Sequence, residues 1–300
     1  EVGRCVMTYT TILFLEFLPV VFERFRLEYL YAIWLNLTPW IAIALLVTFA
    51  FAMTQSASWV LAIGVVLVAF ELLVRFGAIH RDPRMPTIVL MAGIMFSVLH
   101  QSSLGSLFLV VPHKLSNIWY SPILPLMFLV SAVAAGVAMV IVESAASAWY
   151  FGREVEVRLL QDVGHVLCWA IFGTLALRAA DLVLRGVGTE LLVISPQSIA
   201  FWIEILVGFV IPLAILLTPD FAESARWLLV ASIMVIVGLV LNRMNVAVVG
   251  ITAPYSPTYY PFWMEVGITT GIVAGGVLAY LVICSNFPVF ASARAHNAEA

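Results

Sequence analysis

The sequence predicts an all-α polytopic transmembrane helix bundle with about nine spans, and two observations predict it. The 300 residues are 63% hydrophobic and only 10% charged, whereas soluble domains are roughly half apolar and about one-quarter charged. The apolar residues also lie in long continuous runs, and about 20 such residues cross a bilayer as a helix. Helices are expected instead of barrel strands, because the runs are long and a helix pairs its own backbone groups in lipid.

Helix breakers divide the apolar runs, and each run between them is a predicted span. The nine predicted spans are Val2–Val21, Tyr31–Met53, Trp59–Phe76, Pro86–Val111, Pro122–Tyr150, Val163–Leu184, Ile199–Leu217, Trp227–Val240 and Phe262–Cys284. We expect residues 1–300 to form a single integral membrane domain. The apolar run begins at Glu1 without a preceding Met, so we also expect further N-terminal spans to be missing from this chain.

The basic residues predict the orientation of the bundle. With nine spans, nine arginines fall on one side and four basic residues on the other. The richer side holds Arg24, Arg26, Arg75, Arg81, Arg84, Arg153, Arg158, Arg226 and Arg294, and the poorer side holds Lys114, Arg178, Arg185 and Arg243. Because positive charge accumulates in cytoplasmic loops, the C-terminus is expected in the cytoplasm and Glu1 at the outer face.

Several classes of function are excluded by composition. The net charge of −3 and the lack of a basic stripe argue against nucleic-acid binding. Cys5, Cys168 and Cys284 are isolated in sequence, so neither an iron–sulfur cluster nor another metal site is expected on this chain. Haem is not expected either, because bis-histidine ligation needs paired deep histidines and only His100 lies deep in a span. A partner subunit would therefore have to deliver any electrons.

Ionisable groups inside a membrane are costly and are candidates for function. Most of them fall in the predicted outer half of the membrane: Glu1, Arg4, His100, Arg178, Asp181, Glu204, Arg243 and Glu265. In the opposite half, Glu71 and Arg75 are spaced as an interfacial ion pair. For Glu16 and Glu143, a proton path and a structural hydrogen bond between helices remain equally good interpretations. Trp119 and Tyr120 are predicted to belong to an interfacial aromatic belt.

His100 also allows two interpretations. It precedes Gln101, Ser102, Ser103 and Gly105, small or polar residues that suit a close contact between helices. The functional interpretation is chemical, because a quinone ring needs donors to its carbonyls and two protons on reduction. Histidine titrates in the range that lets it donate a proton and be protonated again.

The segment from His100 to Leu107 (HQSSLGSL), continued by Pro112–Leu115 and Trp119–Pro122, resembles the NrfD/PsrC (polysulfide reductase membrane subunit) family, especially its HybB- and DsrP-like branch. Further matching segments occur in the family's order: Glu1–Gly3, Leu15–Phe17, Phe22–Arg24, Met139–Glu143, Leu177–Asp181, Phe201–Glu204, Leu241–Asn245 and Tyr260–Glu265. The resemblance covers most of the chain. Family members carry additional upstream spans, whereas two extra apolar spans lie here between Arg26 and Arg84.

The resemblance implies a quinone-interacting integral subunit of the bacterial or archaeal cytoplasmic (inner) membrane, without haem or iron–sulfur clusters of its own. It would exchange electrons between menaquinone or ubiquinone and a ferredoxin-like iron–sulfur subunit at the outer face. Catalytic redox subunits, such as a hydrogenase or a sulfur-metabolising enzyme, would complete the complex, and lipid would surround the spans. By the family's pattern, Glu1 and His100 are the catalytic, proton-handling groups.

Other roles are interpretations of the same pattern. His100, Arg178, Asp181, Arg243 and Glu265 are predicted to line or brace the quinone site. Glu16, Glu143 and Glu204 are predicted to extend a proton path and thereby to allow proton translocation. Two alternatives remain open: a proton-coupled secondary transporter, which also needs buried carboxylates, and a purely structural membrane anchor for a redox enzyme.

Overall fold

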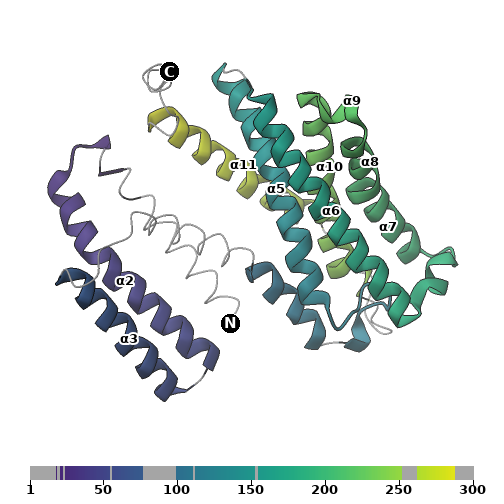
Figure 1. The fold of residues 1–300 in the computed structure, drawn as a ribbon. Helices are drawn as coiled ribbons and strands as arrows, with labels where there is room; N and C mark the ends of the chain where they lie inside the picture. Colours follow the sequence, from purple (N-terminus) through teal and green to yellow (C-terminus); the bar gives the residue numbers. More distant parts are fainter. Residues whose placement is uncertain are drawn as a thin grey trace. The chain divides into compact units, whose positions relative to one another are not determined.

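The structure, a computed structural model, describes residues 18, 21–22, 24–54, 56–76, 99–110, 112–152, 155–251 and 262–287. Two compact units are formed by Glu1–Ser97 with Tyr260–Ala300, and by Val98–Tyr259. Among the described residues, the extended structure is limited to an isolated antiparallel bridge between Leu115 and Ile251. All other regular structure there is helical, which confirms the predicted all-α class (Figure 1).

The first unit contains the long helices α2 (Glu28–Thr54), α3 (Ala57–Arg75) and α11 (Trp263–Asn286). Helices α2 and α3 follow one another in the chain and pack side by side. A side chain at the end of α3 also holds the two helices together, because Arg75 Nη2 donates a hydrogen bond of 2.8 Å to the carbonyl of Asn36 within α2. The predicted ion pair is confirmed, with Arg75 Nε 3.2 Å from Glu71 Oε1.

The second unit is a bundle of four long helical segments (Figure 1, teal to green). Its helices are α5 (Leu124–Phe151), α6 (Val157–Arg185), α7 (Pro196–Ile205), α8 (Ile211–Leu217), α9 (Pro219–Ala222) and α10 (Ala225–Met244). π-Helical turns η4 (Leu206–Val210) and η5 (Asn245–Val249) join α7 to α8 and extend α10. Short 3-10 turns are η1 (Phe108–Val110), η2 (Pro112–Lys114) and η3 (Val187–Leu192).

The helix ends carry the local signals that their sequences favour. Gly152 (φ 63°) and Gly186 (φ 69°) end α5 and α6 in the left-handed conformation that glycine adopts without strain. Ser195 begins α7 with a capping box, in which Ser195 and Ser198 each accept a hydrogen bond from the other's backbone N–H. The chain reverses its direction after each of these helix ends, so α5, α6 and α7 run antiparallel in turn.

Helix α10 is the centre of the bundle, since it packs against α5, α6, α8 and η4. The backbones of η4 and α10 approach closely at Gly208 and Gly238, where a Cβ added to Gly208 would lie 2.5 Å from the Gly238 Cα atom. The π turn ends two residues before Pro212, which lacks an N–H group and would clash with a carbonyl in a regular helix. A wider turn relieves that clash.

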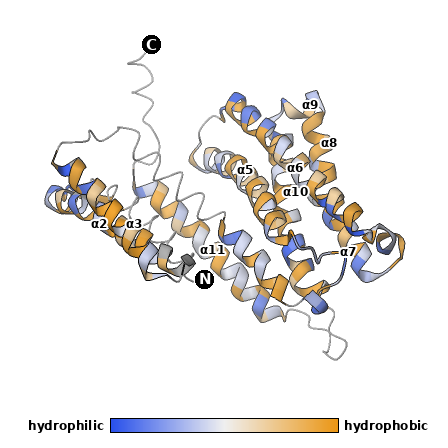
Figure 2. Ribbon diagram, turned by 60° about the horizontal axis from the view of Figure 1, so that its bottom comes forward, coloured by the Kyte–Doolittle hydropathy of each residue, from blue (hydrophilic) through white to orange (hydrophobic). Residues whose placement is uncertain are grey.

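Within the described residues, six helices are long and apolar enough to cross a membrane. They are Glu28–Thr48, Leu124–Phe151, Val157–Arg185, Pro196–Leu217, Ala225–Val249 and Trp263–Asn286. A shorter apolar helix, Ala57–Leu73, corresponds to the third predicted span. Figure 2 shows hydrophobic residues along most of the length of these helices. The predicted spans at Val2–Val21 and Pro86–Val111 lie mostly outside the described residues, so the count of nine stays approximate.

Some helices are longer than the predicted spans. Helix α6 begins at Val157 instead of Val163, and the eighth span continues to Val249 instead of Val240. The added residues include Arg158, Asp162 and Asn242. Because these residues are polar, a prediction from hydropathy leaves them outside the spans. Polar residues are tolerated there because they lie near helix ends or face protein.

Candidate functional site

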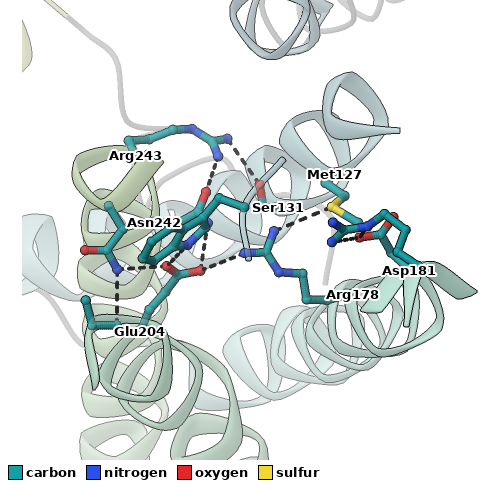
Figure 3. A network of polar contacts seen from close by, with 11 residues as sticks. Met127, Ser131, Arg178, Asp181, Glu204, Asn242 and Arg243 are labelled. Carbon is teal, nitrogen blue, oxygen red and sulfur yellow. Dashed lines mark hydrogen bonds and ion pairs between the residues drawn. The ribbon is translucent and has the colours of Figure 1, made fainter. Parts of the chain in front are cut away.

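Charged and polar side chains gather at one end of the second unit. Because successive long helices run antiparallel, the start of α5, the end of α6, the start of α7 and the end of α10 meet at that end. The side chains that gather there, here called the polar cluster, are Arg178, Asp181, Arg185, Glu204, Asn242, Arg243 and Asn245, with Trp119, Ser121 and Ser131. Figure 3 shows most of this cluster.

Glu204 on α7 is the centre of the polar cluster and is only 1% exposed. Its Oε1 atom accepts a hydrogen bond of 2.7 Å from Asn242 Nδ2. Its Oε2 atom accepts hydrogen bonds of 3.1 Å from Trp119 Nε1 and 2.9 Å from Asn245 Nδ2. Three N–H donors therefore replace the water that a buried carboxylate loses.

Arg178 on α6 supplies the opposite charge, and only 8% of this residue is exposed. Its Nη2 atom lies 3.8 Å from Glu204 Oε1, and its guanidinium lies 5.3 Å from the ring centre of Phe201. Its Nη1 atom donates to Met127 Sδ at 3.5 Å, and thioether sulfur is a weak acceptor. Within the described part of the chain, Arg178 Nε and Nη2 make no hydrogen bond.

Arg243 joins α10 to the start of α5. Its Nη1 atom donates to Asn242 Oδ1 at 2.6 Å, and its Nη2 atom donates to the Phe128 carbonyl and to Ser131 Oγ, each at 3.1 Å. The guanidinium also lies over the Phe128 ring, 3.5 Å from its centre, which adds a cation–π attraction. Asn242 thus links Arg243 to Glu204.

Asp181 lies one turn after Arg178 on α6 but pairs with a different arginine. Arg185 donates to Asp181 Oδ2 through Nε at 2.8 Å and Nη2 at 2.6 Å. Ser121 Oγ donates to Asp181 Oδ1 at 2.5 Å, and Arg185 Nη1 donates to the Asn117 carbonyl at 2.6 Å. This pair ties the segment before α5 to the end of α6.

A small cavity of about 20 Å³ lies beside the polar cluster. Its polar lining comes from Ser131, Thr174, Arg178, Glu204 and Asn242, and its apolar lining includes Met127, Phe128, Leu175, Leu177, Ile205 and Phe209. The volume is far below the several hundred Å³ that small-molecule sites usually offer. A quinone ring therefore does not fit inside it.

The helical residues 99–107, which carry His100, pack against the start of α5. A Cβ added to Gly105 would lie 2.8 Å from Pro125 Cα, so only glycine allows this approach. The rings of Phe108 and Phe128 lie 6.1 Å apart. Phe128 also contacts Arg243. Its ring therefore connects the end of the His100 helix to the polar cluster.

The structure brings together three of the predicted site residues, Arg178, Glu204 and Arg243, and places Asp181 beside them. His100 is half-buried in the adjoining helical segment. Glu143 is exposed on α5, about 18 Å further along the helix than Ser131 at 1.5 Å per residue. Glu265 is exposed in the first turn of α11, which belongs to the other unit. Glu1 and Glu16 lie outside the described residues.

One expectation from the sequence is wrong. Trp119 was expected in an interfacial belt, yet it is 0% exposed and donates its indole N–H to Glu204. The indole ring fills a buried space between the segment after η2 and the helix ends, so it contacts protein instead of lipid headgroups. An aromatic residue at the end of a span looks the same in the sequence whether its ring lies among lipid headgroups or inside the protein.

Asn242, Asn245, Ser121, Ser131 and Arg185 were not predicted as site residues. A usable signal exists for the two asparagines, because they flank Arg243 in Leu241–Asn245 within an otherwise apolar span. For the serines, no signal distinguishes a buried partner from an ordinary small residue. Among the residues that the structure describes, no group of three or more His, Cys, Asp or Glu is placed to hold a metal ion.

Comparison with known proteins places the chain in a family. The family model "Polysulphide reductase, NrfD" matches residues 3–254. The chain belongs to the polysulphide reductase NrfD family. The matched range contains the His100 helix and the whole polar cluster, so the geometry described above is that of an NrfD-family subunit. No solved structure matches the chain significantly.

Three relatives are informative. A protein of Nitratidesulfovibrio vulgaris (strain Hildenborough) is 28% identical over 299 residues, which are 96% of this chain and 64% of that protein. The probable Ni/Fe-hydrogenase 2 b-type cytochrome subunit of Escherichia coli (strain K12) is 28% identical over 208 residues, 67% of this chain and 52% of the relative. The Hdr-like menaquinol oxidoreductase integral membrane subunit of Archaeoglobus fulgidus is 23% identical over 207 residues, 65% and 51% respectively. The chain thus spans between about half and two-thirds of the length of these NrfD-family relatives.

Proposed function

We propose that this NrfD-family chain is the quinone-interacting membrane subunit of a multisubunit redox complex. It would exchange electrons between the membrane quinone pool and a ferredoxin-like iron–sulfur subunit, which is bound in turn to a catalytic redox enzyme. The observation that carries the proposal is the buried polar cluster at one end of a membrane bundle, directly beside the His100 helix. The names of the hydrogenase and menaquinol oxidoreductase relatives support it.

The proposed chemistry assigns a role to each part of the site. His100 donates a hydrogen bond to a quinone carbonyl and passes protons, and Glu1 restores its proton. Because the 20 Å³ cavity admits no ring, the ring would lie outside it. Arg178, Asp181, Arg243 and Glu265 would then line or brace the site.

We further propose that the polar cluster faces the outer side of the cytoplasmic (inner) membrane, where the iron–sulfur subunit would bind, and that the C-terminus is cytoplasmic. The support is the asymmetry of basic residues between the two sides. A reporter enzyme that is active only outside the cytoplasm, fused to the C-terminus of the full-length protein, is expected to stay inactive. An active reporter would reverse the assignment.

We propose no haem on this chain, although the name of the E. coli relative contains "b-type cytochrome". A reduced-minus-oxidised spectrum of the purified subunit is expected to lack haem α-bands, and a band in proportion to this chain would contradict the proposal.

Proton translocation through Glu16, Glu143 and Glu204 is also a proposal. Glu143 and Glu204 lie too far apart to exchange a proton directly, so the path would need intervening groups or water.

The site assignment is tested by His100→Ala in the complete complex. Quinone-linked turnover should fall at least tenfold, whereas turnover of the partner enzyme with an artificial dye should stay unchanged. His165→Ala, on the far half of α6, is the matched control and should keep both activities. Unchanged quinone turnover in His100→Ala would refute the role of His100. Membership of the NrfD family favours this function over a transporter or a purely structural anchor.

A further inference from the structure

Arg178 is a buried cation with unused donors. Its Nε and Nη2 atoms are shielded from solvent and make no hydrogen bond within the described part of the chain, and Nη1 reaches only a thioether sulfur. The neighbouring Arg185 is different, because three of its N–H groups donate to oxygen at 2.6–2.8 Å. Buried N–H groups are nearly always satisfied by protein or by ordered water.

The cavity beside Arg178 has the size of one water molecule. Its volume is about 20 Å³, and an ordered water requires roughly 10–15 Å³ on this measure together with two to four polar partners. Arg178, Glu204 and Thr174 all line the cavity. The cavity is thus large enough for an ordered water and too small for a quinone ring.

The acceptors around the cavity are incompletely used. Glu204 Oε1 accepts from Asn242 and lies 3.8 Å from Arg178 Nη2, beyond the length of a direct hydrogen bond. Thr174 Oγ1 donates to the Ala170 carbonyl at 2.8 Å, so its lone pairs remain available to accept. A polar pair separated by more than 3.5 Å is the arrangement that a bridging water completes.

We propose that this cavity is a binding site for a single ordered water. The water accepts a hydrogen bond from Arg178 and donates to Glu204 Oε1 and to Thr174 Oγ1. It thereby satisfies one of the unused donors of the guanidinium. It also extends the hydrogen-bond network from the polar cluster to Thr174, about one helical turn nearer the start of α6. This inference concerns the same cluster as the proposed function but does not depend on quinone binding.

The test is cryo-electron microscopy of the complete complex at about 2 Å resolution, where ordered waters are visible. One water is expected in the cavity, within hydrogen-bond distance of Arg178 and Glu204. An empty cavity, while other buried waters in the same map are resolved, would overturn the proposal. So would a direct Arg178–Glu204 hydrogen bond that closes the cavity, or a density with the contacts of a chloride ion instead of a water.

Two variants connect the density to the proposed partners. Thr174→Leu fills the cavity and should remove the water, while Thr218→Leu should retain it. Thr218 is the matched control, because its hydroxyl donates to the Ala214 carbonyl in the same way at the opposite end of the bundle. If Thr174→Leu does not assemble, Thr174→Val removes only the acceptor and should lower the occupancy of the water. Full occupancy in either Thr174 variant would refute the bridge.

Quinone-linked turnover of the same wild-type sample separates the two proposals. An ordered water without quinone turnover would refute the proposed function alone. Quinone turnover with an empty cavity would refute the water site alone.

Discussion

The two halves of the second unit are built from the same four helical segments in different ways. At one half, the interior consists of apolar side chains, among them Ile141, Leu167, Leu228 and Val235. At the other half, the same segments enclose the polar cluster around Glu204 and Arg178. Apolar side chains gain little by leaving lipid for protein, so helix contacts in membranes depend on close packing and on hydrogen bonds. The apolar half therefore supplies packing, and the polar half supplies specific connections and chemistry.

Loss of the central carboxylate should have the largest effect. Glu204→Leu removes the acceptor of three hydrogen bonds and the partner of a buried guanidinium. Breaking a buried pair in this way is expected to destabilise the subunit by about 3–5 kcal/mol. Thermal unfolding of the purified complex measures this effect. Glu223→Leu, at an exposed acidic residue after α9, is the control, and equal unfolding temperatures for the two variants would refute the central role of Glu204.

Removal of one donor should have a smaller effect. Asn245→Ala loses hydrogen bonds from Nδ2 to Glu204 Oε2 (2.9 Å) and to the Ala200 carbonyl (3.2 Å). A hydrogen bond to a charged group contributes about 1.5–3 kcal/mol. The variant should therefore unfold at a lower temperature than wild type but above Glu204→Leu. If Asn245→Ala unfolded at a lower temperature than Glu204→Leu, Asn245 would have a further role.

The close contact between η4 and α10 predicts a steric effect. In Gly238→Ala, the new methyl would clash with the Gly208 backbone, and such overpacking costs about 1–3 kcal/mol. Gly136→Ala on α5 is the matched control, because an added Cβ there meets no atom within 4 Å. The control should be neutral or gain up to about 1 kcal/mol from helix propensity. Equal stability of both variants would contradict the close packing.

The smallest expected effect is a packing defect in the apolar half. Ile141→Val removes one methylene from a side chain that is 0% exposed, which costs about 0.5–1.5 kcal/mol. Quinone-linked turnover per folded complex should not change, because Ile141 touches no member of the polar cluster. A specific loss of turnover at normal stability would show that the two halves do not have separate roles.

The sequence predicted the class of fold and the end of the bundle at which Arg178, Glu204 and Arg243 gather. The lengths of the apolar runs decide the class of fold, and the antiparallel order of the spans decides which end of the bundle each residue reaches. Run length and span order can be read directly along the chain. The identity of each partner could not be predicted in this way. Arg178 and Asp181 are three residues apart, yet Asp181 pairs with Arg185 and Arg178 faces Glu204 on another helix, because the rotation of each helix decides which side chains meet.

Trp119 illustrates the same limit. Its position at a span end predicted an interfacial ring, and only the packing of the preceding segment against the helix ends decides that the ring is buried. Asn242 and Asn245 could not be assigned to the site from the sequence for a related reason. A polar residue within an apolar span signals a contact, but the sequence does not say which carboxylate it serves.

Mass spectrometry of the proteins that copurify with this chain from native membranes in mild detergent would show whether it is the membrane subunit of a redox complex. We expect a cysteine-rich, ferredoxin-like protein and a larger redox enzyme in fixed proportion to this chain. A chain that purifies alone through repeated gentle preparations would refute its assignment to a redox complex.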